Sequence, residues 1–219
     1  MHYQLLNNHY IVTIDKKKYL IDTGRPDSFV FDNAPSSVII NDQSYDLGPN
    51  TMDQEATEAT MKLVGEKIDG FISARIIAQT GLTIYKNGEL FFENRPIDGR
   101  VIPFDSTIEV VSNGIRGRFY IDTGAKYGYM DERLIPSTPA VELNAYDFNP
   151  HPRLRHMHTN MYEVPIEIDG RKTTIVAGYN KGTINFPIGM RGIILIGNIT
   201  TLFDEACVVD LRNGRLILK

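Results

Sequence analysis

The tetrapeptide Ile-Asp-Thr-Gly occurs twice in this chain, and this repeat limits the possible folds more than any other feature. The first copy covers residues 21–24 and the second covers residues 121–124, so Asp122 follows Asp22 by 100 positions. Self-similarity at a long, fixed offset indicates an internal duplication. The two halves of the chain should then share further elements in the same order.

Two pairs of β-hairpins are predicted at matching places in the halves. Residues 10–20 and 106–120 each read as a strand, a polar turn and a second strand that leads into the aspartate. Residues 38–47 and 164–176 each alternate apolar and polar side chains about a polar turn. The repeat therefore extends well beyond the two tetrapeptides.

A third pair of hairpins is predicted near the end of each half, at residues 82–92 and 208–218. Each segment contains Asn-Gly, at residues 87–88 and 213–214. This dipeptide favours a two-residue type I′ turn, in which both central residues have positive φ.

Helices and one insert complete the plan. Residues 68–79 and 194–205 each predict an apolar turn into a short helix, and residues 52–64 predict an amphipathic helix in the first half. The second half instead carries an insert at residues 136–162, rich in Pro, Asn and His. We expect that insert to be a surface loop, and a loop of this kind could cover a cleft.

Composition restricts the partners. The 219 residues, 42% of them hydrophobic, are enough for a sizeable core, and a net charge of −4 argues against a nucleic-acid partner. No apolar run is long enough to span a membrane, and the first residues lack the pattern of a secretory signal, so we expect no membrane association and a cytoplasmic location. The single cysteine, Cys207, lies in an apolar run and is predicted to be buried and free of disulfides.

Two aspartates that meet in a shielded site have a defined chemistry. They cannot both ionise, so they share one proton. One carboxylate can then draw a proton from a water that attacks a peptide carbonyl, while the other protonates the carbonyl oxygen. This scheme needs no metal and no other cofactor.

The neighbours of each aspartate suit this chemistry. Gly24 and Gly124 allow the tight turn that presents the carboxyl group. Thr23 and Thr123 carry hydroxyls that can bond the backbone of the opposite loop. A single Asp-Thr-Gly would be an ordinary turn, but two copies at equivalent places in a duplicated plan indicate a site.

On these motifs the chain resembles the pepsin-like and retropepsin-like aspartic proteases. LIDTGRPDS and YIDTGAKYG resemble the two catalytic loops, with Ala125 as the usual small residue after the second glycine. Residues 195–198 resemble the apolar-apolar-Gly segment behind such a loop, and residues 69–72 resemble its partner, although the first half continues with Ser73 where the second has Gly197.

The resemblance implies a mainly β fold: a two-lobed acid-protease barrel of the double-ψ, retropepsin-like kind, with pseudo-twofold duplication and a few short helices. It implies an N-terminal lobe at residues 1–97 and a C-terminal lobe at residues 98–219. Asp22 and Asp122 would be the catalytic pair. Because one chain supplies both, a monomer would suffice.

The substrate cleft is expected to involve Arg25, Tyr45, Phe71 and Ile196. Arg25 departs from the small residue that the resemblance implies. Its guanidinium either lies beside the aspartates and lowers their shared pKa, or points outward and binds an acidic group of the substrate. Two segments are candidates for the flap over the cleft: residues 38–47, which include Tyr45, and the insert of the second half.

Three histidines in the insert, His151, His156 and His158, suggest a metal site at first sight. No HExxH spacing or cysteine accompanies them, and Arg153 and Arg155 add positive charge. We interpret the segment as a solvated loop and expect no metal.

Two functional hypotheses follow from the sequence. The first is an aspartic endopeptidase acting on an extended polypeptide. The second is a peptide-binding or interaction protein that keeps the scaffold without turnover, motivated by Arg25 and the unassigned flap.

Overall fold

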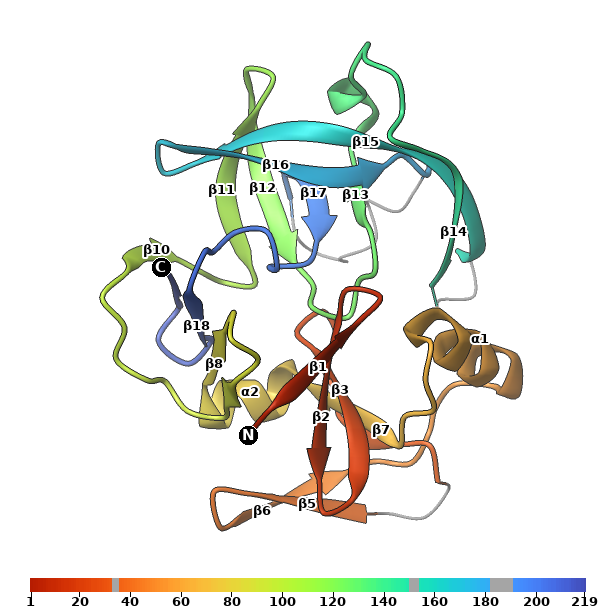
Figure 1. Ribbon diagram of the computed structural model, residues 1–219, viewed down its shortest axis with the longest axis vertical. Helices are drawn as coiled ribbons and strands as arrows, with labels where there is room; N and C mark the ends of the chain where they lie inside the picture. Colours follow the sequence, from red (N-terminus) through yellow and green to blue (C-terminus); the bar gives the residue numbers. More distant parts are fainter. Residues whose placement is uncertain (33–35, 150–153, 182–190) are drawn as a thin grey trace.

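The protein is mainly β and contains a six-stranded β-barrel (Figure 1). The computed structural model describes residues 1–32, 36–149, 154–181 and 191–219. Neither of the α-helices among these residues is long and apolar enough to cross a membrane.

The elements of the first half are, in chain order, β1 (Tyr3–Leu6), β2 (His9–Ile14), β3 (Lys17–Asp22), β4 (Phe29–Val30), β5 (Ser36–Ile40), β6 (Gln43–Leu47), α1 (Gln54–Val64), β7 (Gly70–Ser73), α2 (Ala74–Thr80), β8 (Leu82–Tyr85) and β9 (Leu90–Phe91). Those of the second half are β10 (Arg100–Pro103), β11 (Thr107–Ser112), β12 (Ile115–Ile121), β13 (Gly128–Met130), the 3-10 helix η1 (Glu132–Leu134), β14 (Glu142–Asn149), β15 (Arg155–Ile168), β16 (Arg171–Gly178), β17 (Ile193–Gly197), β18 (Ala206–Asp210) and β19 (Arg215–Leu218).

The barrel belongs to the second half of the chain. Its strands follow the order β11-β12-β17-β13-β16-β15, and a pairing of Val111 with Glu167 joins β15 back to β11. The seventh strand of this sheet, β14, pairs with β15 and extends beyond the ring toward α1 (Figure 1). Alternate side chains of the barrel strands are buried, as in Val164, Ile166 and Ile168 of β15.

Both halves hold their aspartate in the same arrangement of three strands. In the first half, β3 runs parallel to β7 and β4 runs antiparallel to β7, in a sheet of order β1-β2-β3-β7-β4. In the second half, β12 runs parallel to β17 and β13 runs antiparallel to it. In each half, a central strand, β7 or β17, thus lies between the strand that leads to the aspartate and the strand that follows its loop.

A further sheet is shared by the two halves. Its order is β10-β19-β18-β8-β9, so that β8 of the first half pairs with β18 of the second. Cys207 lies on β18, buried and unpaired as expected. The pairing buries apolar side chains from both ends of the chain in one core.

The predicted hairpins are confirmed as β2–β3, β11–β12, β5–β6 and β15–β16. The helix expected at residues 52–64 is α1, whose N-terminus is capped by Asp53 through a bond from the N–H of Ala56 at 2.8 Å. The helix expected within residues 68–79 is α2.

The helix expected after β17 is absent, so this prediction is wrong. Residues 198–205 form turns instead. The carboxamide oxygen of Asn198 accepts a bond from the N–H of Thr200 at 3.2 Å. Such a local bond from a side chain to the backbone competes with a helix.

The type I′ turns expected at both Asn-Gly sequences are also wrong. Asn87 and Asn213 lie within the described residues and neither has positive φ, while Gly88 and Gly214 have φ of 96° and 64°. The connections run over residues 86–89 and 211–214, longer than a two-residue loop. Paired positive φ values occur in other turns, such as Asp169-Gly170 at 47° and 78°.

The insert at residues 136–162 is not a loop over its whole length, which corrects a third prediction. It supplies β14 and the first part of β15. The apolar side chains of Ala145, Met157 and Met161 are buried at alternating strand positions. The Pro, Asn and His content of the segment masked this alternation.

A pair of glycine substitutions tests how closely the strands around the first loop approach. A Cβ on Gly70 would lie 2.3 Å from the carbonyl oxygen of Phe29, whereas a Cβ on Gly48 would lie 3.6 Å from that of Ser28. Gly70→Ala should therefore lower the free energy of unfolding by about 1–3 kcal/mol. Gly48→Ala should be neutral or slightly stabilising. Urea unfolding of both variants measures this, and equal effects would contradict the packing described.

Candidate active site

The two Asp-Thr-Gly loops, residues 22–24 and 122–124, are bound to each other by their threonines. The N–H of Thr23 donates to Oγ1 of Thr123 over 3.0 Å, and the N–H of Thr123 donates to Oγ1 of Thr23 over 3.0 Å. Each hydroxyl donates in turn to the isoleucine carbonyl that precedes the opposite aspartate, over 3.0 Å from Thr23 and 2.7 Å from Thr123. Both threonines are buried, so these bonds replace the water that the polar groups have lost.

This crossing brings the two aspartate side chains together. The carboxyl groups of Asp22 and Asp122 lie close enough that the charge of Asp22 acts on Asp122. A Cβ on Gly24 would lie 2.3 Å from Cγ of Asp122, and a Cβ on Gly124 would lie 2.5 Å from Cγ of Asp22. Each glycine N–H also donates to Oδ1 of the aspartate in its own loop, over 3.0 and 2.9 Å. Glycine is therefore required because each carboxyl group occupies the space of a side chain on the opposite loop.

Asn198 supports the second loop from behind. Its Nδ2 donates to the carbonyl oxygens of Thr123 at 3.0 Å and Ala125 at 3.3 Å. The same nitrogen donates to the carbonyl of Asn8 at 2.7 Å, and so ties the turn between β1 and β2 to this loop. One side chain thus connects the two halves next to the aspartates.

Ser73 supports the first loop. Its N–H donates to Oγ of Ser28 over 2.9 Å, and its hydroxyl donates to the carbonyl of Pro26 over 3.0 Å. Ser73 is completely buried. The buried hydroxyl is accommodated here because it donates to a backbone carbonyl of the segment that follows the first loop.

The surroundings of the two carboxyl groups favour one protonation state. Burial raises the pKa of Asp122 well above its usual range, and the charge of Asp22 raises it further. Burial also raises the pKa of Asp22, but the charge of Arg25 opposes this increase. Both carboxyl groups therefore bind a proton more readily than a free aspartate, and the charge of Arg25 makes Asp122 the more readily protonated of the two.

The aspartates lie on the wall of a cavity of about 1240 Å³. Residues from both halves line it, including the sequence-predicted Asp22, Gly24, Arg25, Tyr45, Asp122, Gly124, Ala125 and Ile196. Phe71 is not among the lining residues, which corrects that prediction. It lies one layer deeper, where its ring stacks on Phe29 at a centroid distance of 4.8 Å. The cavity is large enough for several residues of an extended peptide.

Tyr45 faces this cavity from β6 but is itself mostly buried in the core, with its hydroxyl donating to Gln43 over 3.1 Å. The hairpin β5–β6 therefore forms one wall of the cavity.

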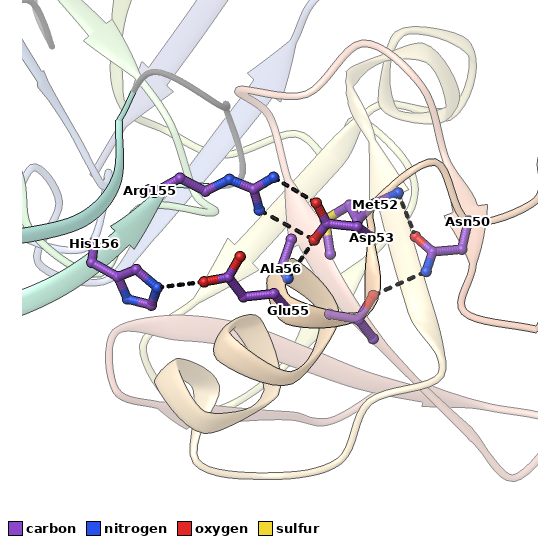
Figure 2. A network of polar contacts seen from close by, with 8 residues as sticks. Asn50, Met52, Asp53, Glu55, Ala56, Arg155 and His156 are labelled. Atoms are coloured by element: carbon purple, nitrogen blue, oxygen red, sulfur yellow. Dashed lines mark hydrogen bonds and ion pairs between the residues drawn. The ribbon is translucent and has the colours of Figure 1, made fainter.

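The hairpin β14–β15 forms another part of the cavity wall and reaches α1. Phe148 of β14 packs against Ala56, Ala59 and Leu63 of α1. Next to this contact, Arg155 donates to both carboxylate oxygens of Asp53, with a distance of 2.6 Å to Oδ2, and Nε2 of His156 lies 3.0 Å from Oε1 of Glu55 (Figure 2). The insert thus lines part of the cavity and is anchored to a helix of the first half.

Tyr129, Asp147 and Phe148 are among the lining residues that were not predicted from the sequence. The hydroxyl of Tyr129 donates to Oδ2 of Asp147 over 2.7 Å, and burial raises the pKa of Asp147 to about 6. Their signal in the sequence was weak, since Asp147 and Phe148 lie in the segment expected to be a loop.

The histidines of the insert do not form a metal site within the described residues. His156 and His158 are on β15, where their rings lie against Tyr146 at centroid distances of 6.0 and 5.3 Å. His151 and Arg153 lie outside the residues that the structure describes. Among the described residues, no group of three or more His, Cys, Asp or Glu side chains is placed to hold a metal ion.

A scan against models of protein families and a search of curated proteins found no match to this chain.

Substitution of either threonine tests the connection between the loops. Thr123→Val leaves the buried N–H of Thr23 without its acceptor and should lower the free energy of unfolding by about 1–3 kcal/mol. Thr123→Ser keeps the hydroxyl and should restore most of that stability. Urea unfolding of both variants checks this. Equal stability of the Val and Ser variants would show that the crossed bonds contribute little.

Replacing Asp122 tests the protonation state without any substrate. A carboxyl group whose pKa is raised by folding binds more protons in the folded than in the unfolded protein, so stability falls as pH rises above about 4, the ordinary carboxyl range. Asp122→Asn removes this decrease in stability with rising pH, because asparagine does not titrate. The variant should gain thermal stability relative to the wild type between about pH 4 and pH 7.

The exposed Asp98 offers a matched control, since Asp98→Asn makes the same chemical change away from the pair. Melting temperatures of the three proteins across this pH range provide the comparison. A difference between wild type and Asp122→Asn that does not grow with pH would contradict the raised pKa.

Proposed function

We propose that this protein is an aspartic endopeptidase that hydrolyses peptide bonds of an extended polypeptide. The observation that carries the proposal is that the carboxyl groups of Asp22 and Asp122 lie next to each other on the wall of a large cavity. Two carboxyl groups that share a proton provide a base and an acid at one place, which peptide hydrolysis by an activated water requires.

The proposal includes the finer fold, a two-lobed acid-protease barrel of the double-ψ, retropepsin-like kind with lobes at residues 1–97 and 98–219. The matching arrangements β3-β7-β4 and β12-β17-β13 support it, because each presents one aspartate from the same place. The closed six-stranded barrel lies in the second half alone, so the halves are similar in their central strands and different at their edges.

The proposed reaction assigns different roles to the two carboxyl groups. Asp22, ionised beside Arg25, takes a proton from water as the oxygen attacks the carbonyl carbon. Asp122, protonated, gives its proton to the carbonyl oxygen, so that a neutral tetrahedral intermediate forms. The proton now on Asp22 passes to the leaving amine as the C–N bond breaks, and Asp122 recovers its own from the collapsing hydroxyl.

The alternative is a protein that binds peptides in this cavity without cleaving them. The observation in its favour is the charge of Arg25, which lowers the pKa of Asp22 and works against the shared proton. Two observations favour the enzyme: the carboxyl groups of Asp22 and Asp122 lie next to each other, and Arg25 forms an ion pair with neither of them in the part of the chain that is described.

A peptide-cleavage assay distinguishes the endopeptidase from the binding protein. A mixture of unstructured peptides is incubated with the protein across about pH 3 to 7 and cleavage products are identified by mass spectrometry. Cleavage should occur without added metal and show a bell-shaped pH dependence, because it needs the pair with one proton. Asp22→Asn and Asp122→Asn should each lower kcat by at least about 100-fold.

Activity that survives either substitution would contradict the paired mechanism. Binding of peptides to the wild type with no cleavage at any pH would favour the alternative. Arg212→Gln, on the exposed turn between β18 and β19, serves as a control for the effect of losing one charge.

A further inference from the structure

Arg25 holds its guanidinium at a fixed place on the wall of the cavity. It directly follows Gly24 of the first loop. Its Cζ lies 4.4 Å from the ring centroid of Phe29 and 5.6 Å from that of Phe71. The two rings are stacked on each other, so they form a rigid support for the planar group. A guanidinium that is held by one face presents its N–H edge to the cavity.

The N–H groups of Arg25 are poorly satisfied by the protein. One nitrogen lies 3.9 Å from Sδ of Met52, and the other donates to Oγ1 of Thr51 over 3.4 Å. Both contacts are long, and neither supplies a negative charge. Among the residues that the structure describes, no carboxylate forms an ion pair with Arg25.

The other arginines of the cavity wall are different. Arg75 is paired with Asp27 at 3.7 Å, and Arg155 with Asp53 at 2.6 Å, as Figure 2 shows for the second pair. The charge of each is thus balanced locally. Arg25 is half-buried without such a partner, and its burial lowers its own pKa, which reflects the unfavourable loss of water around the cation.

A carboxylate from a bound molecule would supply what Arg25 lacks. Its two oxygens match the spacing of two N–H groups on one guanidinium edge, and such paired bonds are about twice as strong as neutral ones. Asp22 lies close enough for its charge to act on Arg25. The carboxylate of the bound molecule would therefore lie close to the peptide bond that faces the two aspartates.

We propose that Arg25 makes the cavity selective for peptides with an Asp or Glu side chain close to the bond held at Asp22 and Asp122. This inference rests on the proposed binding of peptides in the cavity and adds the substrate class. It assigns to Arg25 the recognition of a charged side chain, while the apolar wall around Phe148 and Ile196 receives neighbouring uncharged ones.

Matched peptides test the proposal. Each is acetylated and amidated, so that no terminal carboxylate is present, and Gln is replaced by Glu at one position at a time around the cleavage site. Binding is measured to the Asp122→Asn variant, which separates recognition from chemistry, and kcat/KM is measured with the wild type. At one position Glu should be preferred over Gln by about 10-fold or more.

Variants of Arg25 in the Asp122→Asn background identify the group responsible. Arg25→Gln should abolish the preference for Glu, and Arg25→Glu should reverse it in favour of Lys at the same position. Arg212→Gln makes the same change of charge at an exposed site and should leave the preference intact. Circular dichroism verifies that each variant is folded, and the wild-type comparison of Glu with Gln decides the question even where a variant is not.

The outcomes separate this inference from the proposed function. Peptides that bind or are cleaved equally well with Glu and Gln at every position would overturn the role of Arg25 and leave the endopeptidase proposal standing. A preference that persists in Arg25→Gln would assign it to another cation and overturn the inference as well. The absence of binding for every peptide would overturn both.

Discussion

The crossed bonds between Thr23 and Thr123 are the interaction on which the site depends. Each half of the chain presents a buried N–H and an isoleucine carbonyl that bond to the threonine of the other half. A buried donor without a partner costs about 1–3 kcal/mol, so the loops cannot separate without losing several such bonds at once. Since each aspartate precedes its threonine by one residue, fixing the threonines also fixes the distance between the carboxyl groups.

The duplicated arrangement is symmetric in its backbone but not in its charge. Arg25 follows the first loop, whereas Ala125 follows the second, so a cation stands next to Asp22 at the position where the loop of Asp122 has a methyl group. This difference lowers the pKa of Asp22 relative to that of Asp122 and favours the proton on Asp122. A symmetric pair would have to acquire such a bias from the bound molecule.

The parts of the fold that follow from local pattern could be predicted from the sequence. The hairpins of both halves, α1 and the meeting of the two loops all follow from the periodicity of apolar residues or from the repeated tetrapeptide. The turns after Gly197 could not be predicted in this way, because a bond from the N–H of Thr200 to Asn198 outweighs the resemblance to the first half. The position of Phe71 behind Phe29 depends on packing between strands that no local pattern encodes.

The contact between β14 and α1 depends on apolar packing more than on the polar contacts beside it. Arg155–Asp53 and His156–Glu55 join exposed or half-exposed side chains, and such surface pairs contribute little to stability. Phe148 is 6% exposed against α1, and removing a buried side chain of this size from its contacts costs about 1.5–3 kcal/mol. Movement of β14 away from α1 is therefore resisted mainly because it would expose the side chain of Phe148 to water.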